Sequence, residues 1–409
     1  MIMNKIAIYT LTSELHDEQA VSNVTSEFLN SLRIAYDFQG SDYADYGTHT
    51  LDLIYVRTGG TEGIFLRQLS QLQAQSQRPF YLLTSGKSNS LAASMEILSY
   101  LRQQGLKGEI IHGSTEYIGK RISVLSKAAE ARLQLYGCRL GIIGKPSDWL
   151  ISSHTDKARV KELLGIELVD IPMQELTAPL LSPRGGKTDS SAGDGTPPSP
   201  QWGTEGGLPI EGALHIYEAL KALVERHRLQ GFTLRCFDLL TAVKNTGCLA
   251  LAKLNAEGIV AGCEGDVPAL LSMTIAQALT GVSGFQANPS RIDPQTGQML
   301  FAHCTIPLNL VEHYELDTHF ESGIGVGIRG YMAAGPVTIF KVAGDLSRHF
   351  IAEGELVCNQ SQPDLCRTQQ VIRLTDPVAT AYFLTNPIGN HHIILPGHHR
   401  ELIEEILNS

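Results

Sequence analysis

The chain has 409 residues, more than one hydrophobic core usually organises, so we expect two or three domains. Hydrophobic residues make up 43% of it and charged residues 18%, and the formal net charge of -10 argues against nucleic acid or an anionic membrane surface as a partner. Small molecules are therefore the expected ligands.

The cysteines and the amino-terminal segment indicate a reducing compartment. Seven cysteines are scattered along the chain without a CxxC pair, which is typical of free thiols. The first eleven residues contain a short apolar run without the composition of a signal peptide, and no apolar stretch has the length of a transmembrane helix. We therefore expect a cytoplasmic protein.

Strand-like and helical patterns alternate in the first third of the chain. The strand-like runs cover residues 5–9, 51–56 and 80–83, and the helical ones cover residues 20–32 and 63–74. Such alternation predicts a parallel sheet. Two Gly-rich turns, TGGTEG at 58–63 and TSGKSN at 84–89, precede helices whose free amides could hold an anion or hydroxyl groups, although simple turn chemistry explains these turns as well.

The same alternation restarts near residue 138. Strands are expected at 138–144, 167–171, 232–237 and 258–261, and helices at 155–164, 210–229, 247–257 and 267–279. Residues 182–207 are dense in Gly, Ser and Pro, which predicts a mobile loop that could also serve as a lid. From about residue 285 the pattern changes to short β-rich segments, which favour an antiparallel sheet or a barrel. These segments cover residues 299–304, 325–331, 337–342 and 371–374.

The stretch GCEGDVPALLSM at 262–273 is the leading candidate for a site of chemistry. It places Glu264 and Asp266 at the carboxyl end of a strand, where ligands bind in open α/β sheets. Asp266 also has a plain structural explanation as the cap of the next helix. Glu264 has no capping role, and a carboxylate at a buried strand end needs a cation or a proton nearby.

Histidines concentrate in the last quarter of the chain. Eight of the fourteen lie beyond residue 300, in part within HCT at 303–305, HFESG at 319–323 and GNHHIILPGHH at 389–399. Lone histidines are usually structural, but grouping on strand ends and Gly turns favours metal binding by His303 and His391.

At these positions the chain resembles the L-fucose isomerase and L-arabinose isomerase superfamily, most closely its fucose-isomerase-like branch. There a strand, turn and helix carry a metal-binding Glu, matched here by Glu264 in CEGDVPALLSMTIAQALTG, and a second acidic ligand follows at the position of Asn288. A late Asn-His pair supplies a substrate contact and a metal ligand, matched by Asn390 and His391. His303 matches a further His ligand of the arabinose isomerases by its place in the chain.

The resemblance implies an α/β protein with two Rossmann-like parallel-sheet domains, at 1–135 and 136–284, followed by a β-barrel-like C-terminal domain at 285–409. It also implies a divalent metal, Mn²⁺ or else Mg²⁺, and a homo-oligomer, a trimer or hexamer with sites at subunit interfaces. The implied reaction is aldose-ketose isomerisation of a small sugar, such as an L-fucose-like sugar, a pentose or a 6-substituted hexose.

The residues fit that chemistry. Moving hydrogen between C1 and C2 of an aldose requires a base beside a carbonyl and a Lewis acid for the enediolate, and Glu264 with a divalent ion can supply both. Carboxylate, amide and imidazole ligands favour Mn²⁺ or Mg²⁺ over a structural zinc. We expect Cys263 and Cys304, next to the ligands, to point away into the core.

Asn288 departs from the family pattern, because an amide can coordinate through its oxygen but cannot carry a proton. The candidates for the second proton carrier are Asp266, Glu321 and Asp238, and Glu321 beside His319 is preferred.

Several polar residues are candidates for contacts with the sugar. They are Asn390, Asp238, His319 and Arg367, the last of which could hold a carboxylate, sulfonate or phosphate or could be an ordinary surface residue. The alternative function is that of a catalytically altered isomerase homologue, acting as a sugar-binding or regulatory protein.

Overall fold

The computed structural model describes residues 6–182 and 208–408. The loop predicted at 182–207 lies, apart from Ser182, outside these residues. The chain forms two compact units, one of residues 1–133 with 401–409 and one of residues 134–400.

The first unit is built on a five-stranded parallel sheet with the strand order β2-β1-β3-β4-β5. Its strands are β1 (Ile6–Leu11), β2 (Asp37–Gly40), β3 (Leu51–Val56), β4 (Phe80–Leu83) and β5 (Gly108–Ile111). Its helices are α1 (Glu18–Ser31), α2 (Glu62–Gln75), α3 (Ser90–Gln103) and most of α4 (Thr115–Leu135), with a 3-10 turn at Lys87–Asn89. Every residue of β1 and β3 is buried, which explains their continuous apolar runs, and the predicted parallel sheet is confirmed.

The two Gly-rich turns of this unit hydrogen-bond to their own surroundings. The Gly59 amide donates to the Ser88 carbonyl at 2.7 Å, and the Gly86 amide donates to the Thr84 hydroxyl at 3.1 Å. These two amides therefore brace the turns, in line with simple turn chemistry.

The last helix of the chain, α12 (Arg400–Asn408), belongs mainly to the first unit. Its apolar face buries Ile403 and Ile406, and Glu405 lies 2.5 Å from the Arg121 guanidinium of α4. An amphipathic helix with two buried positions three residues apart packs in this way.

The second unit contains a four-stranded parallel sheet with the order β7-β6-β8-β9. Its strands are β6 (Arg139–Ile143), β7 (Glu167–Ile171), β8 (Gly231–Leu234) and β9 (Val260–Cys263). The helices around it are α5 (Lys157–Leu164), α6 (Met173–Leu181), α7 (Ile210–His227), α8 (Asp238–Ala242), α9 (Cys248–Ala256) and α10 (Val267–Thr280).

The rest of this unit is antiparallel. Six strands close into a barrel in the order β10-β11-β16-β15-β14-β17, and β12 pairs with β13 beside it. The strands are β10 (Phe285–Asp293), β11 (Gln298–His303), β12 (His313–Asp317), β13 (Gly327–Tyr331), β14 (Gly335–Val342), β15 (His349–Asn359), β16 (Thr368–Leu374) and β17 (His392–Pro396). The helix α11 (Thr380–Thr385) and 3-10 turns at Leu308–Leu310 and Pro377–Ala379 complete the unit. The expected fold class, two parallel-sheet α/β parts and a β-barrel in the C-terminal region, is confirmed.

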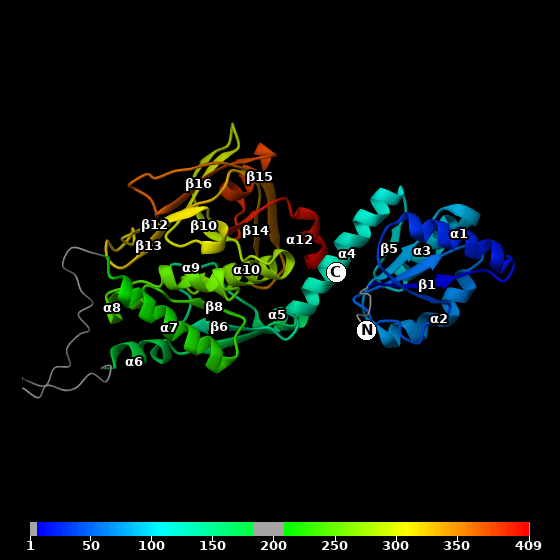
Figure 1. The fold of residues 1–409 in the computed structure, drawn as a ribbon, viewed down its shortest axis with the longest axis horizontal. Coiled ribbons are helices and arrows are strands. Elements are labelled where there is room, and N and C mark those ends of the chain that lie inside the picture. Colours follow the sequence, from blue (N-terminus) through cyan, green and yellow to red (C-terminus); the bar gives the residue numbers. More distant parts are fainter. Residues whose placement is uncertain (1–5, 183–207, 409) are drawn as a thin grey trace, which may run out of the picture. The chain divides into compact units, whose positions relative to one another are not determined.

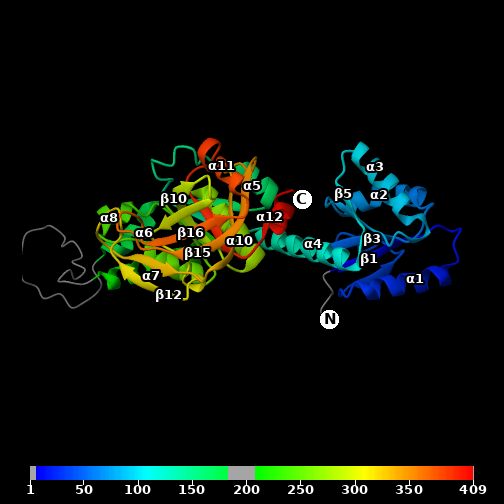
Figure 2. The same ribbon diagram turned by 90° about the horizontal axis from the view of Figure 1, so that it is seen from above.

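Helices α9 and α10 lie between the four-stranded sheet and the barrel (Figure 1), and seen from above the barrel strands β10, β15 and β16 lie in front of the helical layer (Figure 2). All residues of α10 from Val267 to Ala276 are buried, because the helix has apolar neighbours on both sides. The turn that precedes α10 therefore opens at the junction of sheet and barrel, and it holds Glu264 and Asp266.

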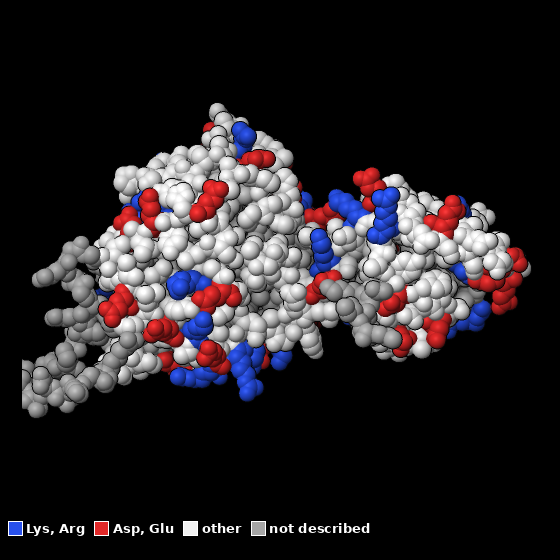
Figure 3. All heavy atoms as spheres, in the orientation of Figure 1, with Lys and Arg blue, Asp and Glu red and all other residues white. Residues whose placement is uncertain are grey.

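The surface carries charges of both signs. On the face shown in Figure 3, Lys and Arg side chains of the described residues are interspersed with Asp and Glu side chains. Among residues 6–182 and 208–408, no helix is long and apolar enough to cross a membrane.

Candidate metal centre

The turn between β9 and α10 has an unusual backbone. Glu264 and Gly265 both have positive φ, 64° and 71°, and a Cβ on Gly265 would lie 2.5 Å from the Lys145 carbonyl oxygen. Glycine adopts this conformation freely, whereas a Glu there costs about 1–2 kcal/mol. Residues held in such conformations cluster at functional sites.

Three side chains from distant parts of the chain meet at this turn. Glu264 Oε1 lies 3.7 Å from Nε2 of His303, at the end of β11, and 3.5 Å from Nε2 of His391, just before β17. One ligand atom from each of the three lies within 4.8 Å of the others, and all three residues are well buried.

Several nitrogens of this group have no hydrogen-bond partner. These are both ring nitrogens of His303 and Nε2 of His391, and all three are buried. A buried polar atom without a hydrogen-bond partner is rare in a folded protein. A carboxylate and two imidazoles facing one point fit a divalent cation, so this cluster could bind a divalent metal ion.

The electrostatics of the cluster follow from burial and from the facing charges. Burial alone would raise the pKa of Glu264, but the charge of His391 and the His303 ring lower that pKa far below its usual range. Burial would lower the pKa of His391, yet Glu264 and Asp266 raise it to about 9. For His303 burial is the larger effect, and its pKa is lowered. Without metal, His391 is therefore the protonated ring.

Asp266 lies behind His391. Its Oδ1 accepts a hydrogen bond from the Ala269 amide at 2.9 Å and so caps α10, while Oδ2 lies 2.8 Å from His391 Nδ1. Burial alone would raise the pKa of Asp266, but the charge of Lys341 and the bond to His391 lower it to about 2. The bond to Nδ1 directs His391 Nε2 toward Glu264, as carboxylates do for metal-binding histidines.

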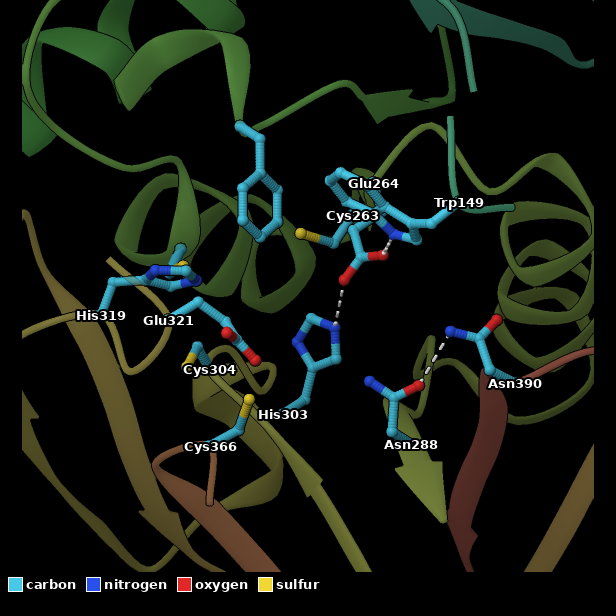
Figure 4. Close-up of a pocket in the computed structure, with 12 residues that line it drawn as sticks. Trp149, Cys263, Glu264, Asn288, His303, Cys304, His319, Glu321, Cys366 and Asn390 are labelled. Atoms are coloured by element: carbon cyan, nitrogen blue, oxygen red, sulfur yellow. Dashed lines mark hydrogen bonds and ion pairs between the residues drawn. The ribbon is translucent and has the colours of Figure 1, made fainter. Parts of the chain in front are cut away.

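A cavity of about 330 Å³ opens onto Glu264 and His303. Figure 4 shows the Glu321 carboxylate pointing from the segment between β12 and β13 toward the His303 ring. On another side, Asn390 Nδ2 donates to Asn288 Oδ1 at 3.0 Å. The residues that line the cavity are Trp149, Phe237, Cys248, Cys263, Glu264, Asn288, His303, Cys304, His319, Glu321, Cys366 and Asn390.

Two aromatic residues of the wall were not anticipated from the sequence. Trp149 Nε1 donates to Glu264 Oε2 at 2.7 Å, and the Trp149 ring packs edge-on against Phe237, with ring centroids 4.8 Å apart. Phe237 in turn packs edge-on against the His319 ring, with ring centroids 5.5 Å apart. The available signal for Trp149 was its place in the turn KPSDWLISS, directly after β6, at the sheet edge where ligands bind.

The structure brings together most of the residues predicted for the site but not all of them. Glu264, His303, Asn288, Asn390, His319 and Glu321 line the cavity, whereas His391 and Asp266 lie behind the wall.

Asp238 and Arg367 are not among the lining residues. Asp238 Oδ1 accepts a bond from Arg235 Nε at 3.0 Å, and Arg367 Nε donates to the Thr318 carbonyl at 2.7 Å. Both side chains hydrogen-bond within the protein, and their contact with a sugar stays a prediction.

The expected burial of Cys263 and Cys304 is confirmed: both are almost fully buried, and Cys263 packs in the apolar core of the second unit. Both also border the cavity, together with Cys248 and Cys366. The cause is tertiary: the strand ends that carry Glu264 and His303 converge, so their sequence neighbours reach the same space. Cys263 Sγ also lies 3.1 Å from Cys236 Sγ.

Comparison with known proteins finds a distant and partial similarity. No protein-family model matches the chain. The sulfoquinovose isomerase of Clostridium sp. (strain MSTE9) is 30% identical over 129 residues, which are 31% of this chain and 27% of that protein. The match thus spans about a quarter of the relative's length.

Proposed function

We propose that the protein is a divalent-metal-dependent aldose-ketose isomerase that acts on a small sugar or sugar derivative through an enediol. One observation carries this proposal: a buried carboxylate and two imidazoles, with ligand atoms within 4.8 Å of one another, stand at a cavity of about 330 Å³ with a second carboxylate, Glu321, in its lining. The distant similarity to a sugar isomerase supports the same class of reaction.

Glu264, His303 and His391 would hold the ion, with Asn288 as a direct ligand or one layer further out. Mn²⁺ is our first choice for the ion, and Mg²⁺ is the alternative. When bound, a divalent cation supplies Lewis-acid polarisation of the sugar carbonyl. The Trp149 N–H keeps one oxygen of Glu264 engaged and leaves the other oxygen facing the two histidines.

Proton transfer falls to Glu321 in this proposal. Asn288 cannot carry a proton, and Asp266 is enclosed behind His391, whereas Glu321 is exposed and lines the cavity. Glu321 would take the proton beside the carbonyl and return it to the neighbouring carbon, a role that typically contributes about 10²–10⁴-fold to rate.

The amides would orient the sugar. Because Asn288 Oδ1 accepts from Asn390, the Asn288 Nδ2 hydrogens and the Asn390 Oδ1 remain for substrate hydroxyls. Burial lowers the pKa of His319 to about 4, so this ring is neutral near pH 7 and can donate or accept a hydrogen bond. By the family resemblance we also propose a homo-oligomer, trimer or hexamer, which light scattering would measure.

A sugar panel tests the function. The full chain with Mn²⁺ is incubated with pentoses, hexoses, 6-deoxyhexoses and sulfoquinovose, and conversion is followed by ¹³C NMR. We expect at least one aldose to yield its ketose, and Glu264→Gln to abolish both conversion and tight metal binding.

A specific observation favours the alternative of a sugar-binding or regulatory protein. Asn288 stands where the family has an acid, and its oxygen is engaged by Asn390. If the protein with full Mn²⁺ occupancy converts no sugar of the panel but binds one in calorimetry, the isomerase proposal falls and this alternative replaces it.

A further inference from the structure

Lys341 is a fully buried lysine in a barrel strand. Its side chain has 0% exposure, and it stands in the otherwise uncharged sequence GPVTIFKV of β14. Lysine is almost never fully buried unless it is paired, because removing an ammonium group from water is costly. The contacts of its Nζ therefore show what holds it there.

Lys341, Asp266 and His391 each contact the other two. Lys341 Nζ donates to the His391 backbone carbonyl at 2.8 Å and lies 3.6 Å from Asp266 Oδ2. Asp266 Oδ2 is in turn 2.8 Å from His391 Nδ1. His391 is thus held at both its peptide and its ring, and all three side chains have 0% exposure.

The backbone next to His391 lies in contact with this lysine. Gly389 has a φ of 106°, and a Cβ there would lie 3.5 Å from Lys341 Cε and 3.6 Å from its Nζ. Gly389 and the His391 carbonyl therefore both lie against the end of the Lys341 side chain.

We propose that Lys341 is a positioning residue of the metal centre. Its ammonium group aims the Asp266 carboxylate at Nδ1 and fixes the His391 peptide, so that Nε2 faces Glu264 and a bound cation. The proposal rests on the proposed metal centre but not on the identity of the sugar. Groups that orient a metal-binding histidine in this way usually affect metal affinity by about 10–100-fold.

The decisive variant is Lys341→Met, which keeps an unbranched chain and removes the charge. We expect its dissociation constant for Mn²⁺, measured from the free-ion EPR signal, to rise about 10–100-fold. The matched control is Thr338→Val on the same strand. Thr338 is also fully buried, and its hydroxyl bonds the Gly397 carbonyl and the His399 amide, away from the metal centre. This control should lower thermal stability and leave Mn²⁺ affinity unchanged.

A spectroscopic readout separates positioning from mere packing. In ¹⁵N spectra of histidine-labelled, metal-free protein, Lys341→Met should shift or broaden the His391 Nδ1 resonance and leave the His303 resonances in place. If the folded variant keeps wild-type Mn²⁺ affinity and an unchanged His391 signal, Lys341 only fills space and the proposal is overturned.

A second variant covers the case in which Lys341→Met does not fold. The double variant Lys341→Met with Asp266→Asn removes both buried charges, so it should fold. It should bind Mn²⁺ about 10–100-fold more weakly than wild type and also more weakly than Asp266→Asn alone, because the His391 carbonyl has lost its donor as well. A double variant that binds Mn²⁺ as tightly as Asp266→Asn alone overturns the proposal, as does a wild-type protein that binds no Mn²⁺. A wild-type protein that binds Mn²⁺ but converts no sugar refutes only the isomerase function.

Discussion

The raised pKa of His391 should make metal binding at the proposed centre depend on pH, with a magnitude that can be calculated. In the metal-free protein the ring lies between Asp266 and Glu264, and these groups raise its pKa to about 9. A cation can bind Nε2 only after the proton on that nitrogen has left. The proton therefore competes with the metal at every pH below about 9, and raising the pH strengthens binding.

The magnitude follows from the size of the pKa shift. Because pH 7 is about two units below the pKa of His391, the competition between proton and metal costs about 2.7 kcal/mol of binding free energy. Between pH 6.5 and pH 8.5 the apparent affinity for Mn²⁺ should rise about 80-fold. A histidine with an ordinary pKa near 6.5 would give only about a twofold rise.

Isothermal titration calorimetry under anaerobic conditions measures both quantities. Titration of Mn²⁺ in buffers of different ionisation enthalpy should show close to one proton released per ion at pH 7. His319→Gln is the matched control, because the pKa of His319 is lowered to about 4 and the ring carries no proton to release in this range. An affinity that is flat between pH 6.5 and pH 8.5, or no proton release, would refute the assignment of His391 as both ligand and protonated ring.

Four further predictions concern the same centre. Glu321→Gln should lower kcat by about 10²-fold or more with Mn²⁺ affinity unchanged; a wild-type kcat would exclude Glu321 as proton carrier. Trp149→Phe removes a hydrogen-bond donor to the Glu264 carboxylate. Hydrogen bonds to charged groups contribute about 1.5–3 kcal/mol, and because Trp149 is half exposed we expect the lower end, so Mn²⁺ should bind about tenfold more weakly in the EPR assay. An equal affinity for Mn²⁺ would contradict this role of Trp149. With metal removed, the melting temperature should fall as pH rises from 6.5 to 9. The stability that protonated His391 contributes is complete below its pKa in the unfolded chain, near 6.5, and is lost as the pH passes its pKa in the folded protein, about 9. A melting temperature that rises over this range would contradict the raised pKa of His391. A hydrogen bond from Cys366 lowers the pKa of the Cys304 thiol despite its burial. A small methanethiosulfonate should therefore modify Cys304 before the other cavity thiols, as mass spectrometry would show, and should weaken sugar binding in calorimetry. Modification of another cavity thiol first would contradict the lowered pKa of Cys304.

Much of the fold could be predicted from the sequence, because strand and helix periodicity are local properties. The apolar runs of β1, β3 and β6, the change to short β segments near residue 285 and the cap at Asp266 are all visible within a few residues. Glu264 was also visible, since a carboxylate at a buried strand end has few explanations other than a ligand.

The site required the tertiary structure, because its members lie far apart in the chain. Asp266 and His391 are 125 positions apart and meet because β17, a strand of the closed barrel, contacts α10. The choice among Asp266, Asp238 and Glu321 depended on which carboxylate faces the cavity, which composition does not encode.

Lys341 shows the same division most clearly. By sequence it is one lysine at the end of an apolar strand, and period-two alternation says only that it lies on one face of the barrel wall. Its structural role depends on the Asp266 carboxylate, 75 residues earlier, and on the His391 carbonyl, 50 residues later. The sequence by itself determined the elements and the types of the candidate ligand residues, whereas long-range packing decided which charges are buried together, because only packing sets the distances between them.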